Sequence, residues 1–209
     1  MENFFSNPVY IVEGFDMVGK SFFMNYVMSD YKVYHATHDL TDETVGRHNS
    51  WTIGYGVMDF LSQVGTDNLK VVIDRGVSSS FVYKHLYGMD SEVSFPGELT
   101  IDRVVDWYSK NEFFKSGVNH IHICHLRKAS ARQIFEKSKT REVNPNALSA
   151  QMDRFSDFDE YWKTYLKAEE LFDEVYDKLD IEPIIVKTYP GGFVVNYPNG
   201  FETTVRVRL

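Results

Sequence analysis

The chain has little of several things that would mark other protein classes. It contains one cysteine, Cys124, so no intrachain disulfide can form. No apolar run approaches the length of a membrane span, and no basic N-terminal region precedes an apolar one. We therefore expect no signal peptide, no membrane association and a cytoplasmic location. Cys124 lies in the apolar run 121–126, which predicts a buried strand residue rather than a reactive thiol.

Basic residues are outnumbered by acidic ones, 22 to 30, which gives a formal net charge of −8. An acidic protein repels phosphate backbones, which argues against a broad nucleic-acid-binding surface. The cations that exist are unevenly spread. Fifteen residues, 127–141, hold one acid and these six basic residues: Arg127, Lys128, Arg132, Lys137, Lys139 and Arg141. Such a stretch can bind a small anion or a short piece of nucleic acid.

The length of 209 residues and the apolar fraction of 43% predict one globular domain, 1–209. Short β-rich runs alternate with helical patterns, which predicts an α/β fold around a central parallel sheet of about five strands. The expected strands are 8–12, 32–35, 69–74, 119–126 and 183–187. The expected helices are 20–28, 51–64, 78–86, 101–114 and 155–179.

The last part of the chain carries two further patterns. Aromatic and aliphatic residues recur every three, four or seven positions through 155–179, which predicts one buried helix face. Near the C-terminus, two β-rich runs flank Pro198-Asn199-Gly200 and predict a hairpin over about 192–208.

The strongest motif follows the first expected strand. Residues 14–21 have the form G-x-x-x-x-G-K-S, between an apolar strand and an apolar-rich helix. In such a loop the glycines allow the backbone N–H groups to surround phosphate, the lysine reaches the β- and γ-phosphates, and the serine hydroxyl binds Mg²⁺. The predicted ATP-binding residues are Glu13, Gly14, Phe15, Asp16, Met17, Val18, Gly19, Lys20 and Ser21.

A second motif ends the strand 69–74, where Asp74 and Arg75 follow an apolar run. In open α/β sheets ligands bind at the carboxyl ends of strands, so this pair falls beside the loop if the two strands are neighbours. Asp74 would then bind Mg²⁺ together with Ser21, and Arg75 would bind an acceptor anion. The alternative is a helix-capping aspartate and a structural ion pair.

Together these motifs resemble the thymidylate kinase family of P-loop phosphotransferases. The match runs through Glu13-Gly14-x-Asp16-x-x-Gly19-Lys20-Ser21 and Asp74-Arg75, followed by Ser79, Ser80 and Tyr83. The resemblance implies an ATP- and Mg²⁺-dependent kinase in which Asp16 positions the acceptor and Arg75 clamps its phosphate. It also implies a helical basic lid over about 127–150, whose cations Arg132, Lys137 and Arg141 would close over the transferring group. Dimers are common among such kinases, so a homodimer is an open expectation.

The sequence departs from that family after the second strand. The family usually has Arg-Glu-Pro-Gly-Gly there, whereas this chain reads His35-Ala36-Thr37-His38-Asp39-Leu40. Such divergence resembles bacteriophage kinases, among them a subfamily that phosphorylates 5-hydroxymethyluracil within DNA during thymine hypermodification. For a phage protein the expected location is the host cytoplasm.

The acceptor therefore stays open between two chemistries. A nucleotide phosphate is already an anion and needs cationic clamps, whereas a hydroxyl gains from a general base. The candidate bases are His35, His38, Asp39, Asp16 and Glu13. The family default is a deoxynucleoside monophosphate such as dTMP, and the alternative is the hydroxymethyl group in DNA. A non-catalytic nucleotide sensor is a third reading.

For the aromatic and histidine clusters of the sequence, a structural role is the simpler interpretation. Trp51, Tyr55 and Phe60 have the spacing of a helix face, although they could stack on a base. His120 and His122 would share one face of a strand, with His125 nearby. Because no carboxylate or cysteine stands at ligand spacing, structural histidines are favoured over a metal pair.

Overall fold

Parallel strands and a terminal antiparallel pair form a sheet in the order β2-β3-β1-β4-β5-β6-β7. The structure is a computed structural model that describes residues 5, 7–35, 70–87, 100–110, 118–140 and 155–207. Within these ranges the strands are β1 (Val9–Glu13), β2 (Lys32–His35), β3 (Val71–Asp74), β4 (Val118–His125), β5 (Ile184–Tyr189), β6 (Gly192–Asn196) and β7 (Glu202–Arg206). The α/β class and the predicted strand positions are confirmed.

The helices of the described residues are α1 (Lys20–Val27), α3 (Val77–Tyr87), α4 (Ile101–Lys110), α6 (Lys128–Thr140) and α8 (Phe158–Leu179). Four of them match predicted helices to within a few residues, and α6 forms the first part of the predicted lid. The expected helix 51–64 and the rest of the lid, 141–150, lie outside the described residues.

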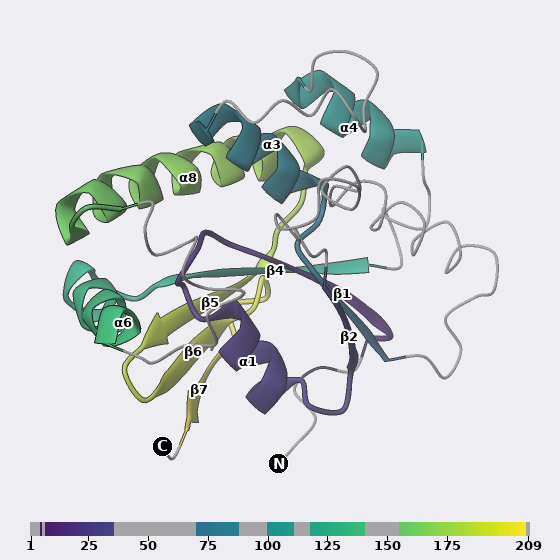
Figure 1. The fold of residues 1–209 in the computed structure, drawn as a ribbon. Helices are drawn as coiled ribbons and strands as arrows, with labels where there is room; N and C mark the ends of the chain where they lie inside the picture. Colours follow the sequence, from purple (N-terminus) through teal and green to yellow (C-terminus); the bar gives the residue numbers. More distant parts are fainter. Residues whose placement is uncertain are drawn as a thin grey trace, which may run out of the picture.

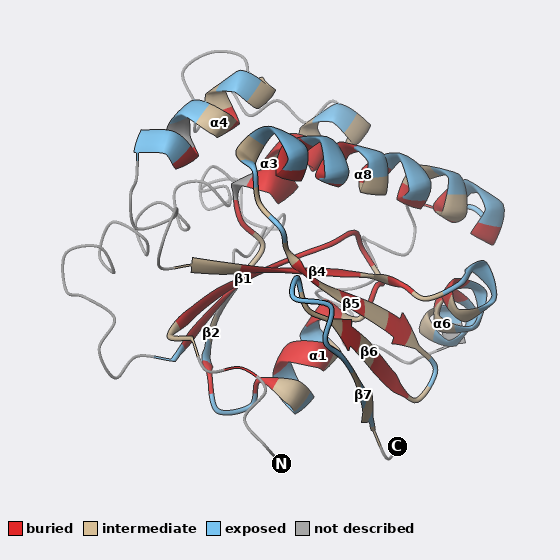
Figure 2. Ribbon diagram, turned by 180° about the vertical axis from the view of Figure 1, so that it is seen from behind, coloured by how far each residue is buried: buried red, intermediate tan, exposed pale blue. Residues whose placement is uncertain are grey.

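The helices lie on both faces of the sheet (Figure 1). Helices α3, α4 and α8 pack against one another over one face, and α1 lies on the opposite face. The central strands are largely buried (Figure 2): every residue of β1 and the first three residues of β3 are buried. This central position of β1 follows from its near-continuous apolar sequence, since a parallel strand is covered on both faces.

Among the described residues the sheet has seven strands rather than about five, because β6 and β7 add an antiparallel pair to the five parallel strands that the sequence predicts. The sequence predicts the C-terminal hairpin. It does not predict that β6 pairs antiparallel with β5 and extends the sheet. The physical reason is packing: Phe193 of β6 lies against Phe22 and Phe23 of α1, with ring centroids 5.7 and 5.1 Å apart. That contact covers the face of α1 that would otherwise lie open.

Helix α8 confirms the predicted apolar face. Its described stripe residues Phe158, Tyr165, Phe172 and Tyr176 are buried, and Asp157 caps the helix by accepting a hydrogen bond from the Glu160 N–H at 2.9 Å. Cys124 lies in β4 as predicted but is only partly buried, and burial raises the pKa of its thiol to about 12. Within the described ranges, every helix is too short or too polar to span a bilayer.

Candidate functional site

Two loops meet at the carboxyl ends of neighbouring strands. Strands β1 and β3 pair in parallel, with Val12 opposite Asp74, so the chain leaves both strands at the same edge of the sheet. The loop 14–19 runs from β1 into α1, and Arg75 and Gly76 run from β3 into α3. The sequence placed Asp74 and Arg75 beside the loop only if β1 and β3 are neighbours, and the pairing shows that they are.

The shape of the first loop depends on its glycines. Gly14 has a φ of 132°, and a Cβ added there would lie 2.2 Å from the carbonyl oxygen of Ile123 in β4. Gly19 has a φ of 94° and precedes the first turn of α1, which contains no acidic residue. The positive end of α1 is therefore not neutralised by its own side chains, as an anion-binding helix terminus requires.

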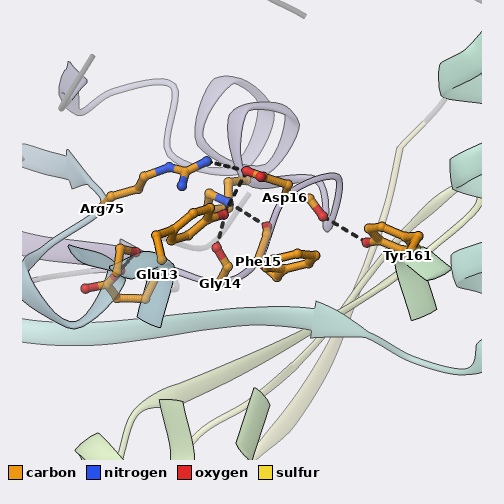
Figure 3. A network of polar contacts seen from close by, with 9 residues as sticks. Glu13, Gly14, Phe15, Asp16, Arg75 and Tyr161 are labelled. Carbon is orange, nitrogen blue, oxygen red and sulfur yellow. Dashed lines mark hydrogen bonds and ion pairs between the residues drawn. The ribbon is translucent and has the colours of Figure 1, made fainter. Parts of the chain in front are cut away.

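Lys20 lies within this loop. Its Nζ donates hydrogen bonds to the carbonyl oxygens of Gly14 and Phe15, both at 2.7 Å, and the residue is 7% exposed (Figure 3). Burial and the nearby Arg75 charge lower the pKa of Lys20 to about 8, against the opposite effect of surrounding carboxylates. The side chain is thus held inside the curve of the loop, where a phosphate oxygen would be its partner.

Asp16 and Arg75 join the two loops. Arg75 donates to the Asp16 carboxylate at 2.6 Å, and the Tyr83 hydroxyl of α3 donates to the same oxygen at 2.7 Å. Burial opposes ionisation of Asp16, but the charges of Arg75 and Lys20 and these hydrogen bonds outweigh it and lower its pKa. Arg75 has a φ of 73°, a left-handed conformation that is uncommon outside glycine and often marks functional positions.

Glu13 has a different place from the one predicted. Its side chain is fully buried, and its two carboxylate oxygens accept hydrogen bonds from the Gly76 N–H at 3.0 Å and from the Ser79 hydroxyl. Burial raises the pKa of this carboxyl despite those bonds. Glu13 therefore fastens the end of β1 to the start of α3 beneath the loop, rather than facing a ligand.

Sequence reasoning missed Tyr161, which reaches the loop from α8. Its hydroxyl donates to the Asp16 carbonyl at 2.8 Å (Figure 3). The same oxygen lies 2.8 Å from His125 Nε2. The Tyr161 hydroxyl donates its one proton to the Asp16 carbonyl, so its oxygen must accept a hydrogen bond from His125. This requires the tautomer of His125 in which Nε2 carries the proton. On the other side, the Thr188 hydroxyl of β5 donates to the Val18 carbonyl at 2.6 Å.

The remaining predicted residues fall into three groups. Phe15 and Val18 are fully buried, so only their backbone groups are available to a ligand. Met17 is partly buried, and Ser21, at the start of α1, is exposed. Arg132 lies on α6, where its guanidinium stacks 4.4 Å from the Phe158 ring and lies 3.6 Å from Asp159. Outside the described residues lie Arg141, His38, Asp39, Trp51, Tyr55 and Phe60.

Two of the histidines of β4 have side-chain partners on α8. His122 lies 3.0 Å from Glu169 and 3.2 Å from the Tyr176 hydroxyl, and His125 Nε2 lies 2.8 Å from the Tyr161 hydroxyl. His120 and His122 share a strand face as predicted. Among the described residues, no group of three metal-ligating side chains is found.

Comparison with known proteins supports the fold alone. No family model matches the sequence, and no curated protein matches it significantly. Among solved structures, a protein assigned as polyphosphate kinase 2 from Pseudomonas aeruginosa superposes with a TM-score of 0.54 at 15% identity, over 85% of this chain. This chain spans only 37% of that protein. Thymidylate kinase from Candida albicans gives a TM-score of 0.47 at 13% identity, over 88% of this chain and 85% of that one. The likeness at 15% identity supports the α/β fold alone.

Proposed function

We propose that the protein is an ATP-dependent phosphotransferase acting on a thymidine-type acceptor. The observation that carries this proposal is the meeting of two features: a glycine-shaped loop holding Lys20 at the start of α1, and the Asp16–Arg75 pair directly beside it. The first fits a donor triphosphate, because the positive φ of Gly14 and Gly19 curls the backbone into a loop and the helix end carries no acid. The second provides a buried cation for an acceptor.

The chain's own residues would divide the reaction as follows. Backbone N–H groups of the loop bind the donor phosphates, and Lys20 stabilises the charge that develops on the transferring group. Ser21 and Asp74 offer the hydroxyl and carboxylate oxygens that Mg²⁺ prefers, and the ion would neutralise the β- and γ-phosphates. Arg75 would orient the acceptor, and the lid cations Arg132, Lys137 and Arg141 would close over the phosphates.

The state of Asp16 favours a phosphate acceptor over a hydroxyl. A general base works best with a pKa near the working pH, whereas the pKa of Asp16 is lowered by Arg75, Lys20 and Tyr83. Glu13, a neighbouring carboxylate whose pKa is raised by burial, is already engaged by Gly76 and Ser79. A nucleoside monophosphate needs no base, so dTMP or a similar deoxynucleotide is the first candidate.

One observation favours the DNA acceptor as the alternative. The cations Arg127, Lys128, Arg132, Lys137 and Lys139 are all exposed along α6. A row of exposed cations can follow a nucleic-acid backbone, and this helix lies beside β4 and β5, whose carboxyl ends face the site. The acceptor would then be the hydroxymethyl group of 5-hydroxymethyluracil in DNA.

A labelling experiment separates these acceptors. γ-Labelled ATP and Mg²⁺ are supplied with deoxynucleoside monophosphates in one reaction and with hydroxymethyluracil-containing DNA in another. We expect label in a nucleoside diphosphate. Label found only in the polymer would replace the first candidate with the second. Stoichiometric ATP binding without transfer to either acceptor would show a nucleotide sensor instead.

Tyr161→Phe tests whether α8 positions the phosphate loop. The change removes one hydroxyl that bonds both Asp16 and His125, and leaving a buried carbonyl unsatisfied costs about 1–3 kcal/mol. We expect ATP to bind roughly tenfold more weakly, measured by calorimetry. The matched control is Tyr165→Phe, whose hydroxyl accepts from the His125 backbone at 3.1 Å and does not touch the loop. Equal effects of both changes on ATP affinity would contradict this role.

A further inference from the structure

A cavity of about 760 Å³ lies at the end of the sheet opposite the phosphate loop. It is bordered by Asn7 before β1, by the first residues of β4 and by Ile184 at the start of β5. The ends of α4 and α8 and the turn between β6 and β7 close it. Tyr10, the second residue of β1, lines the cavity, so four residues of strand, about 13 Å, separate it from Gly14. Its volume falls in the range of small-molecule sites, about 300–1,000 Å³.

His120 on the cavity wall lacks the partners that a buried polar side chain needs. It is 5% exposed, and neither ring nitrogen has a hydrogen-bond partner among the described residues. The other two histidines of β4 both have side-chain partners on α8. Buried polar atoms without partners are few in folded proteins, and each calls for an explanation such as a bound molecule.

The protonation state of His120 limits what that molecule can be. Burial lowers the pKa of His120 to about 4, so the ring is neutral at pH 7. A neutral imidazole has one donor nitrogen and one acceptor nitrogen, and it therefore pairs with groups of both kinds. An anion would favour the protonated ring, which this position disfavours.

The other walls point the same way. The charged residues on the cavity are Lys178, Asp180 and Glu182, which together carry a net charge of −1. Its aromatic walls are Tyr10, Tyr108 and Tyr197, and the Tyr108 ring lies 5.7 Å from the imidazole of His120. Aromatic walls with a slight negative charge favour flat, uncharged ligands over phosphates or carboxylates.

We propose that this cavity is a second ligand site, which takes an uncharged heterocycle of nucleobase or nucleoside size. The tyrosine walls hold the ligand ring, and a rotation of the His120 side chain brings one of its buried nitrogens within hydrogen-bond reach. Such heterocycles carry both donors and acceptors, so they can pair with whichever imidazole nitrogen faces them. The site is separate from the proposed donor and acceptor positions, and the proposal does not depend on the reaction that occurs there.

Titration with thymidine, uridine and adenosine tests the site. Binding is followed by NMR through the imidazole ε1 resonance of His120, identified by its loss in His120→Phe, and through the amide of Gly19 in the phosphate loop. We expect at least one nucleoside to shift the His120 resonance saturably below about 1 mM. No saturable shift in that range, or a shift of Gly19 without one at His120, would overturn the proposal.

Variants of the cavity wall locate the binding independently of His120. His120→Phe should weaken the nucleoside at least about tenfold, as the loss of its hydrogen bonds predicts, while ATP affinity stays within about twofold. Ser109→Trp places a large side chain at an exposed position on the cavity rim and should weaken binding similarly. The matched control is Asp106→Trp, exposed on the same helix but not lining the cavity. Equal loss in Asp106→Trp and Ser109→Trp would contradict the location.

Discussion

Lys20→Ala is expected to lower phosphoryl transfer by about 100-fold or more, measured as kcat with γ-labelled ATP. The reason is electrostatic: Lys20 is the cation held inside the loop, and an alanine leaves the transferring phosphate without it. Because the pKa of Lys20 is about 8, its charge is present below that pH and lost above it. ATP affinity of the wild-type protein should therefore fall as the pH rises through 8, unless bound phosphate holds the proton.

The control for this change is Lys70→Ala. Lys70 is exposed and pairs with Asp30 at the surface, far along β3 from the loop. Removing an exposed ion pair costs about 1 kcal/mol or less, so activity should stay near the wild-type level. Full activity in Lys20→Ala would remove the proposed mechanism, whichever acceptor is used.

Arg75→Met is expected to destabilise the protein by about 3–5 kcal/mol, measured by denaturant unfolding. The side chains of Arg75 and Asp16 are only 11% and 1% exposed, so the change strands a buried carboxylate without its cation. The hydrogen bond from Tyr83 remains but does not replace a charge. Transfer to an anionic acceptor should be lost as well.

The double variant Asp16→Asn with Arg75→Met separates the two effects. Once the carboxylate is neutral, no buried charge is left alone, and we expect the protein to regain much of the lost stability without regaining activity. A double variant whose loss of stability equals the sum of the single losses would show that the two residues act independently. That result would contradict the pairing on which the acceptor proposal rests.

The loop 14–19 and the strand and helix around it could be predicted because their determinants are local. Two glycines, a lysine and a serine at fixed spacing define the loop, and the strand and helix around it follow from apolar patterns over a few residues. The position of Asp74 and Arg75 needed one further assumption, that β1 and β3 are neighbours, and the register confirms it.

Contacts between distant segments could not be predicted in the same way. Tyr161 stands in a helix whose pattern indicates burial, but the pattern does not show that its hydroxyl meets Asp16, 145 positions earlier. A tyrosine in an apolar stripe does need a partner for its hydroxyl, and that need was the available signal. The same holds for the hairpin, whose turn is local but whose pairing with β5 depends on Phe193 meeting α1.

Helix α8 connects the loop 14–19 with the cavity at the other end of the sheet. Tyr161 in its first turn holds the loop, and residues at its other end border the cavity, about 26 Å away along one continuous helix. Two ligands that bias the same rigid element must influence each other equally. Whatever factor a cavity ligand imposes on ATP affinity through α8, ATP must impose on that ligand in return.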